Sequence, residues 1–111
     1  METSDYKRVI LPQAESEIGE TLDYIAEKLF NPTAAVKLME DMEETMQSVS
    51  QFPYSRPQLK DKRLTLGADY RRADVNNFVL IYKVVEEVKE VRIMAAFYAP
   101  SDVVARLLKR I

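Results

Sequence analysis

Two runs of apolar residues in the second half of the chain form the strongest pattern in the sequence. They cover residues 78–85 and 91–98, with the charged segment 86–90 between them. Both runs are rich in valine, isoleucine and aromatic residues, which favour the pleated, half-buried surface of a β-sheet. A joint of about five residues between such runs is typical of an antiparallel hairpin. Residues 70–75 predict a third strand, joined by Asn76-Asn77, because asparagine tolerates the positive φ of a tight turn.

Two amphipathic helices are predicted before these strands. From residue 12 to about residue 30, apolar residues recur at helical spacing, and Pro12 suits the first turn. A second helix is predicted from Pro32 to about Phe52, with Asn31 as its cap. The predicted apolar stripes are Ala14, Ile18, Leu22, Ile25 and Leu29 on the first helix, and Ala35, Met39, Met42, Met46 and Val49 on the second. The two helices should form an antiparallel hairpin with almost no loop between them.

The remaining segments complete a single predicted domain that covers residues 1–111. Residues 6–11 predict a short strand, which joins the sheet only after the helical hairpin has crossed over. Residues 102–110 predict a short C-terminal helix capped by Ser101, and residues 53–67 a long polar loop of the kind that often carries function. The predicted fold class is α+β. A twisted antiparallel β-sheet, in the order β-α-α-β-β-β with a short C-terminal helix, carries a two-helix hairpin on one face.

The composition narrows the possible chemistry. The chain has 111 residues and contains neither cysteine nor histidine, which removes disulfides, the commonest general base and the commonest metal ligand. We expect no cofactor and no metal site, because no spacing of carboxylates suggests one. No apolar run approaches the roughly 20 residues that span a bilayer, and residues 1–5 lack the pattern of a signal peptide. These observations together predict a cytoplasmic protein.

Charge is distributed unevenly along the chain. Residues 1–52 carry 4 basic and 11 acidic residues, whereas residues 53–111 carry 12 basic and 7 acidic residues. An acidic half followed by a basic half predicts that one face meets an anionic partner, and a solvated mixed surface is the alternative. The isoelectric point of about 5.2 argues against tight binding of nucleic acid, which depends on phosphate contacts.

Several motifs resemble those of the RelE/ParE superfamily of toxins from bacterial type II toxin–antitoxin modules. In chain order they are DYIAEKL in the first helix, NPTAA at the start of the second, FPYSRP after it, and then DKRL, DYRRADVNNFVLIYKVVEE and VRIMAAFYAPSD. The resemblance covers about residues 6–108. It is carried by the ordered set of motifs rather than by any one of them, and the order of elements predicted above agrees with it.

The resemblance implies a growth-inhibiting toxin of the plasmid-stabilisation or addiction-module kind, neutralised by a cognate antitoxin. The flexible tail of an antitoxin typically wraps the toxin, and an acidic, apolar tail would suit the basic half of this chain. A homodimer or a toxin–antitoxin hetero-oligomer is compatible with the family. RelE-like members resemble ribosome-dependent ribonucleases that cut mRNA on the ribosome, whereas ParE-like members poison DNA gyrase and are not known as nucleases.

The residues that bear on this choice lie on the predicted strands. RelE-like ribonucleases use Lys and Arg to stabilise charge on phosphate and a Tyr or His as the acid–base group. The resemblance places Arg72 and Tyr70 at the positions of two lysines and Val79 at the position of an arginine. Tyr98 lies near the C-terminal acid–base position, where the usual Arg-rich run reads Ala99-Pro100-Ser101.

A ParE-like, non-nuclease function is favoured, because valine supplies no cation to a phosphate. One alternative is a ribosome-dependent mRNA endoribonuclease with Arg72, Arg71 and Tyr98 as catalytic residues, and another is a decayed toxin that retains only antitoxin binding. The predicted partner-binding residues are Lys60, Lys62, Arg63, Arg71, Arg72 and Tyr98. Arg71 and Arg72 should point to opposite faces of their strand. Their alternative role is an ion pair with Asp69 or Asp74.

Overall fold

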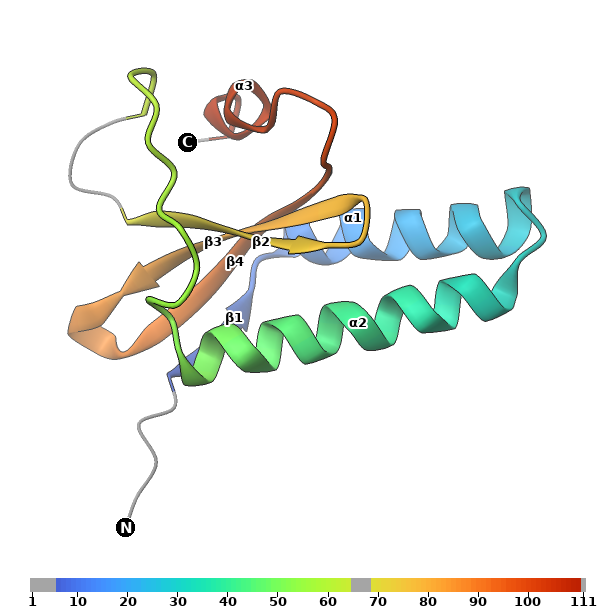
Figure 1. Ribbon diagram of the computed structural model, residues 1–111, viewed down its shortest axis with the longest axis horizontal. Helices are drawn as coiled ribbons and strands as arrows, with labels where there is room; N and C mark the ends of the chain where they lie inside the picture. Colours follow the sequence, from blue (N-terminus) through green and yellow to red (C-terminus); the bar gives the residue numbers. More distant parts are fainter. Residues whose placement is uncertain (1–5, 65–68, 111) are drawn as a thin grey trace, which may run out of the picture.

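A four-stranded sheet forms the centre of the protein (Figure 1). The computed structural model describes residues 6–64 and 69–110. The strands are β1 (Lys7–Ile10), β2 (Tyr70–Val75), β3 (Phe78–Val85) and β4 (Glu90–Tyr98), and their order in the sheet is β1-β4-β3-β2. β2, β3 and β4 form the predicted antiparallel meander, which confirms the interpretation of the two apolar runs.

Both turns of the meander contain a residue in the left-handed region of φ. Asn76 (φ 55°) closes the turn between β2 and β3, as expected for an asparagine. Lys89 (φ 54°) follows the short 3-10 turn Glu86–Val88 and leads into β4. The β3–β4 ladder shifts register between Ile81 and Tyr82. A bulge of this kind bends the strand that holds the extra residue, which here is β4.

β1 pairs with β4 in parallel, so the sheet is mixed, and the predicted antiparallel arrangement holds for its other three strands. The register runs from Lys7 opposite Glu90 to Ile10 opposite Ile93 and therefore covers only the first half of β4. β1 and β4 are joined by a long crossover rather than by a tight turn, and this kind of connection permits parallel pairing. Among the residues that the structure describes, no strand lies on the outer side of the second half of β4.

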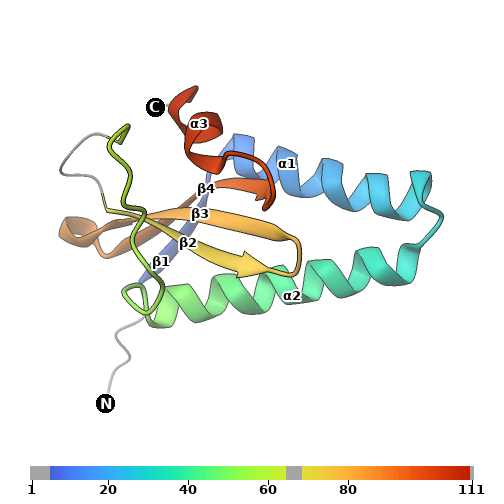
Figure 2. The same ribbon diagram turned by 45° about the horizontal axis from the view of Figure 1, so that its top comes forward.

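The helical hairpin consists of α1 (Pro12–Asp23), the π-helical turn η1 (Tyr24–Lys28) and α2 (Pro32–Gln51). Asn31 caps α2 as predicted, since its side-chain oxygen accepts a hydrogen bond from the N–H of Ala34 at 3.1 Å. Figures 1 and 2 show the hairpin reaching well beyond the turn between β2 and β3. The connection between η1 and α2 therefore forms a free tip.

Both helices bury their apolar sides against one face of the sheet. This core contains Ala14, Leu38, Met42, Met46 and Val49 from the helices, and Ala73, Val75, Leu80, Tyr82, Val84, Val91, Ile93 and Ala96 from the strands. Two predicted stripe positions are wrong, because Leu29 and Met39 are 54% and 49% exposed. Leu38 takes the place expected for Met39. The sheet meets α2 one residue further round the helix than the methionine spacing suggests, and Leu29 lies at the tip beyond the sheet.

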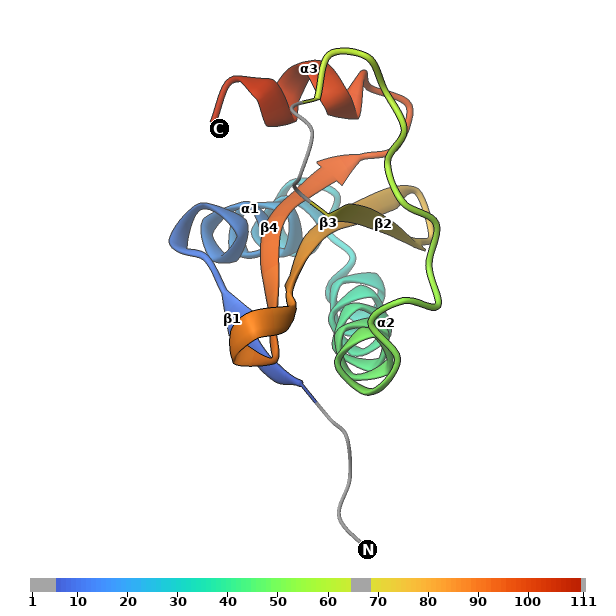
Figure 3. The same ribbon diagram turned by 90° about the vertical axis from the view of Figure 1, so that its left-hand side faces the viewer.

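The opposite face of the sheet is partly covered by α3 (Val103–Leu108), and Figure 3 shows α3 above the sheet with α2 below it. Val103, Val104 and Leu107 of α3 pack with Tyr70, Val79, Ile81, Ala95 and Phe97 of the sheet. Asp102 caps this helix in place of the predicted Ser101, because its Oδ1 accepts a hydrogen bond from the N–H of Ala105 at 3.1 Å. The Ser101 hydroxyl instead donates to the carbonyl of Tyr98 in the turn after β4.

The loop after α2 lies along the outer edge of β2. The N–H of Leu59 donates to the carbonyl of Tyr70 at 2.8 Å, and the N–H of Arg72 donates to the carbonyl of Pro57 at 3.3 Å. This pairing shields part of an edge strand. The end of the predicted loop, residues 65–67, lies outside the described residues. Within the described ranges, no helix is long and apolar enough to cross a membrane, and no acidic cluster of three or more is arranged to hold a metal ion.

Candidate functional site

A groove opens where the end of β4 meets the first helix and its π-helical turn. Tyr98 is 52% exposed, and its ring meets that of Phe78, its partner in the β3–β4 ladder, edge-on with 5.7 Å between the ring centroids. Tyr24, Ile25 and Leu29 contribute the apolar lining on the helix side, and the volume is about 540 Å³. The tyrosine placed near the acid–base position by resemblance therefore lies in a largely apolar groove, which we call the Tyr98 groove.

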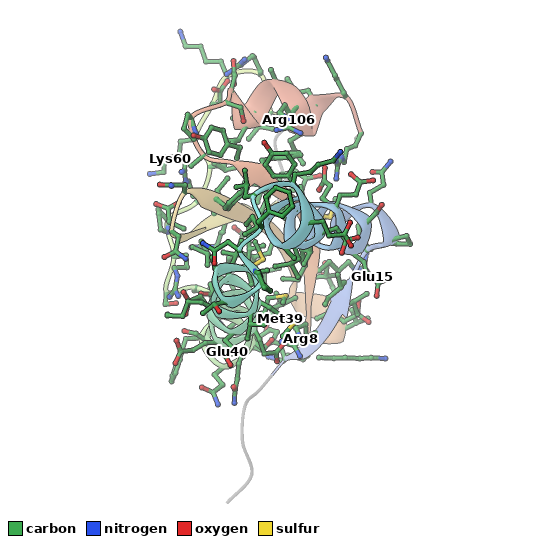
Figure 4. All side chains as sticks on the ribbon, turned by 90° about the vertical axis from the view of Figure 1, so that its right-hand side faces the viewer. Arg8, Glu15, Met39, Glu40, Lys60 and Arg106 are labelled. Atoms are coloured by element: carbon green, nitrogen blue, oxygen red, sulfur yellow. The ribbon has the colours of Figure 1, made fainter. Side chains whose placement is uncertain are left out.

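The charged residues that line the Tyr98 groove are Glu17, Glu20 and Arg106. Glu17 is already engaged, because it accepts a hydrogen bond from the N–H of Ala96 at 2.9 Å and forms an ion pair with Arg110. Figure 4 shows Arg106 on the α3 side of the molecule, above the helical hairpin. Two carboxylates and one cation do not make an electropositive site, so this groove does not favour a phosphate.

Arg72 lies on the opposite face of the sheet from Tyr98. Side chains alternate along a strand, and Tyr70, two positions before Arg72, packs into the core beneath α3. The guanidinium of Arg72 forms an ion pair with Asp74, with 2.9 Å between Nη2 and Oδ1. Val79 is completely buried in the same α3-side core, so this position neither supplies a cation nor reaches a ligand.

Arg71 connects the loop after α2 to the sheet. Its Nε lies 2.9 Å from Oδ1 of Asp69, its Nη1 donates to the carbonyl of Arg56 at 2.7 Å, and its guanidinium lies 5.0 Å from the ring centroid of Tyr54. The Arg71 side chain is only 16% exposed. The ion pairs considered for the two arginines are thus both present, with Asp69 for Arg71 and with Asp74 for Arg72.

A polar cluster around Glu86 joins the start of β1, the loop after α2 and the β3–β4 turn. Oε1 of Glu86 accepts hydrogen bonds from the hydroxyls of Tyr6 and Tyr54 at 2.7 and 2.6 Å, and the carboxylate also pairs with Lys89. The hydrogen bond from Lys89 and those from the two tyrosines lower the pKa of Glu86 to about 2. The hydrogen bond to Glu86 and partial burial raise the pKa of Tyr54 far above its ordinary value. At neutral pH Glu86 is therefore ionised and Tyr54 protonated, so the cluster links the three segments and does not act as an acid–base pair.

Of the three predicted loop cations, Arg63 is engaged within the protein. It forms ion pairs with Asp61 at 2.8 Å and with Asp102, the cap of α3, at 3.0 Å. The hydrogen bonds from Arg63 lower the pKa of Asp61 to about 2. Lys60 and Lys62 are exposed, and Figure 4 shows Lys60 on the outer side of the molecule near the loop. Arg63 therefore links the loop to α3, whereas the two lysines face the solvent.

The structure does not bring the three candidate catalytic residues together. Arg71 is held under the loop after α2, Arg72 lies on the α3 side of the sheet, and Tyr98 lies in the groove beside α1. Within residues 6–64 and 69–110, Arg106 is the only cation that lines the Tyr98 groove. No single surface of the described protein thus presents Arg71, Arg72 and Tyr98 to the same phosphate.

One exposed apolar group was missed by the reasoning from sequence. Phe30, at the tip of the helical hairpin, is 87% exposed and has a φ of 51°, and Tyr24 nearby is 56% exposed. The available signal was the position of Phe30 directly before Asn31-Pro32, where a helix must end. A phenylalanine at such a break falls outside the periodic stripe and has no predicted core contact.

A family profile matches most of the chain. The profile described as the ParE toxin of type II toxin-antitoxin system, parDE, matches residues 9–96, which include both long helices and most of the sheet. The chain belongs to the ParE toxin family. The resemblance to the RelE/ParE superfamily is confirmed by this match. No curated protein sequence shows a significant match to the chain.

Solved structures with this fold include other members of the ParE and RelE groups. The chromosomal ParDE system from P. aeruginosa gives a TM-score of 0.66 at 16% identity, covering 86% of this chain and 98% of that chain. A mutant of E. coli toxin RelE in the free state gives a TM-score of 0.59 at 18% identity, covering 96% of this chain and 98% of that chain. The toxin–antitoxin complex RelBE2 from Mycobacterium tuberculosis gives a TM-score of 0.55 at 15% identity, covering 85% of this chain and 98% of that chain. These likenesses show the ParE-family fold, which RelE shares.

Proposed function

We propose that this ParE-family protein inhibits bacterial growth from the cytoplasm by poisoning DNA gyrase, without cutting RNA. One observation carries the proposal: the residues that the resemblance assigns to RNA cleavage do not face one another. Cleavage through the 2′-hydroxyl of the RNA requires a proton acceptor, a cation on the phosphate and a proton donor, all at one phosphate. Tyr98 and Arg72 lie on opposite faces of the sheet, and Val79 is buried.

The charges around Tyr98 support the same proposal. Glu20 lines the groove, and an exposed carboxylate repels a phosphate. The lining cation Arg106 lies over the ring of Phe97, with 4.3 Å between its Cζ and the ring centroid. Binding of nucleic acid draws most of its free energy from phosphate contacts. A groove of this composition suits a protein partner better than an RNA strand.

We propose further that a cognate antitoxin binds the face that carries α3. Arg72 lies on this face, and Lys83 lies 5.9 Å from the ring centroid of Tyr70, which belongs to the α3-side core. Lys60 and Lys62 add positive charge on the adjacent loop. An acidic, apolar tail would find both cations and apolar surface here. The related ParDE and RelBE2 structures are described as toxin–antitoxin assemblies, which supports a partner of this kind.

Induced expression without antitoxin, followed by pulse labelling of DNA and protein synthesis, tests this function. The expected result is filamentation and a DNA-damage response while translation continues. Purified protein should also trap gyrase in its covalent complex with DNA. Rapid arrest of translation, with mRNA cut at codon boundaries, would instead identify a ribosome-dependent endoribonuclease. Unimpaired growth in the presence of soluble protein would identify a decayed toxin.

A further inference from the structure

The tip of the helical hairpin exposes three large apolar side chains that belong to neither hydrophobic core. Tyr24, Leu29 and Phe30, which we call the tip patch, are 56%, 54% and 87% exposed. The tip projects beyond the turn between β2 and β3 in Figures 1 and 2, and Figure 4 looks directly onto it. Exposed apolar side chains that cluster in this way commonly mark a surface for another protein.

The backbone holds the tip patch in a defined position. The N–H of Leu29 donates to the carbonyl of Tyr24 at 3.1 Å, and the N–H of Asn31 donates to the carbonyl of Ile25 at 3.1 Å. Phe30 has a φ of 51°, which is unfavourable for a bulky residue and is favoured by glycine or asparagine. The chain therefore places a phenylalanine ring in the solvent at a position where the backbone would prefer another residue.

The tip patch is continuous with the Tyr98 groove and has an acidic rim. Tyr24 and Leu29 line that groove as well as belonging to the patch, and Glu20 lies on the same wall. Beside the patch, Glu20, Asp23 and Glu27 line a shallow depression with Tyr24, together with one cation, Lys28. A complementary partner would carry apolar side chains flanked by Lys or Arg, because like charges oppose binding and opposite charges steer it.

We infer that the tip patch and the Tyr98 groove form the surface that engages gyrase, by receiving an apolar segment of that protein flanked by basic residues. The inference rests on the proposed function for the identity of the target. The acidic rim of this surface is opposite in sign to the α3 side, where Arg72 and Lys83 lie. Two partners of opposite charge would therefore occupy separate surfaces, the target at the tip and the antitoxin on α3.

Replacement of Phe30 by asparagine tests the apolar part of this surface. Phe30→Asn removes the ring and supplies a residue that suits the left-handed backbone, so the melting temperature should be unchanged or higher. Phe52→Asn is the matched control, because Phe52 is also exposed (63%) but lies at the other end of α2. We expect Phe30→Asn to need at least about 10-fold more protein to trap gyrase on DNA, as for the loss of an interface hot spot. Phe52→Asn should match the wild type.

Charge reversal tests the acidic rim. The double variant Glu20→Lys/Glu27→Lys should weaken gyrase trapping, and the loss should shrink at high salt because exposed charges are then screened. Glu44→Lys, on the exposed side of α2, changes a comparable carboxylate outside the groove lining and should have little effect. Equal potency of Phe30→Asn, of the rim variant and of the wild type would overturn the inference.

Three further outcomes separate this inference from the proposed function. If the wild type arrests growth but does not trap gyrase, the proposed function fails and the inference, which names gyrase, fails with it, whereas full trapping of gyrase by Phe30→Asn and by the rim variant overturns the inference alone. If Phe30→Asn stays toxic but escapes neutralisation by the antitoxin, or abolishes a self-association seen by ultracentrifugation, the tip binds the antitoxin or a second copy and the inference is wrong. A wild-type protein with no effect on growth or gyrase overturns both.

Discussion

Glu17 and Arg110, which are 93 positions apart in the chain, form an ion pair against the outer edge of β4. Glu17 also accepts the N–H of Ala96, and Arg110 donates to the carbonyl of Met94 at 2.9 Å. These backbone groups belong to the half of β4 that β1 does not cover. The pair thus supplies hydrogen-bond partners to backbone groups of β4 that would otherwise pair with a neighbouring strand. It also holds the segment after α3 beside α1.

Loss of Arg110 should therefore destabilise the whole domain. In Arg110→Ala, Glu17 loses its partner in a site where both side chains are less than one-fifth exposed. We expect a loss of about 2 kcal/mol in the free energy of unfolding, measured by urea denaturation. Arg106→Ala, which removes an exposed cation from α3 itself, should cost less than about 1 kcal/mol. Equal stability of Arg110→Ala and wild type would contradict the structural role of the pair.

The adjacent arginines of β2 should differ in their effect on stability. Arg71→Ala removes a largely buried ion pair, a hydrogen bond to a loop carbonyl and a contact with Tyr54, so we expect a loss of about 2 kcal/mol in the free energy of unfolding. Arg72→Ala removes only a more exposed pair with Asp74 and should cost under about 1 kcal/mol. Thermal melting of both variants checks the order. The reverse order would show that the faces of β2 are assigned incorrectly.

The Glu86 cluster should make the protein sensitive to acid. The pKa of Glu86, about 2, lies below the ordinary value of 4.5 for a glutamate. The Glu86 carboxylate therefore stabilises the fold above pH 4.5, and this contribution is lost as the pH falls towards 2. Glu86→Gln should lower the melting temperature at pH 7 and flatten its decline between about pH 4.5 and 2. Glu87→Gln changes an exposed neighbour outside the cluster and serves as the control. If the melting temperature of Glu86→Gln fell with pH as steeply as that of the wild type, groups other than Glu86 would govern acid unfolding.

Tyr98→Phe separates the two proposed modes of action by removing one oxygen. The variant keeps the edge-on contact with Phe78 and the apolar wall of the groove. If the protein poisons gyrase, growth arrest should remain within about 2-fold of the wild type, because no proton transfer depends on the hydroxyl. A fall of about 100-fold or more would support an acid–base role for Tyr98 and the ribonuclease alternative. Tyr98→Ala, which also removes the ring contact, distinguishes loss of shape from loss of the hydroxyl.

The sheet and the helices could be predicted because their signals are local. Branched and aromatic residues mark β2, β3 and β4, and Asn31-Pro32 marks the junction of the helices. The parallel pairing of β1 depends instead on contacts between distant segments, which no local pattern encodes. The choice of Leu38 over Met39 for the core depends on where the sheet meets α2, and both residues fit a helix equally well.

The candidate site was less predictable than the fold. Resemblance assigned positions to Arg72 and Tyr98, but their faces follow from the strand alternation and from the bulge in the β3–β4 ladder. The ion pairs with Asp69 and Asp74 were foreseen because each lies two positions from its arginine along the chain. The exposure of Phe30 was not foreseen, since it results from the length of the hairpin relative to the strands.

The segregation of charge between residues 1–52 and residues 53–111 should give the molecule an electric dipole moment. Residues 1–52, which include both long helices, are strongly acidic, whereas the remainder is basic. In the field of a charged partner such a molecule rotates before contact, so a larger fraction of encounters begins in one orientation. Association with a basic partner and with an acidic one should both slow as ionic strength rises, and each would begin from the opposite end of the protein.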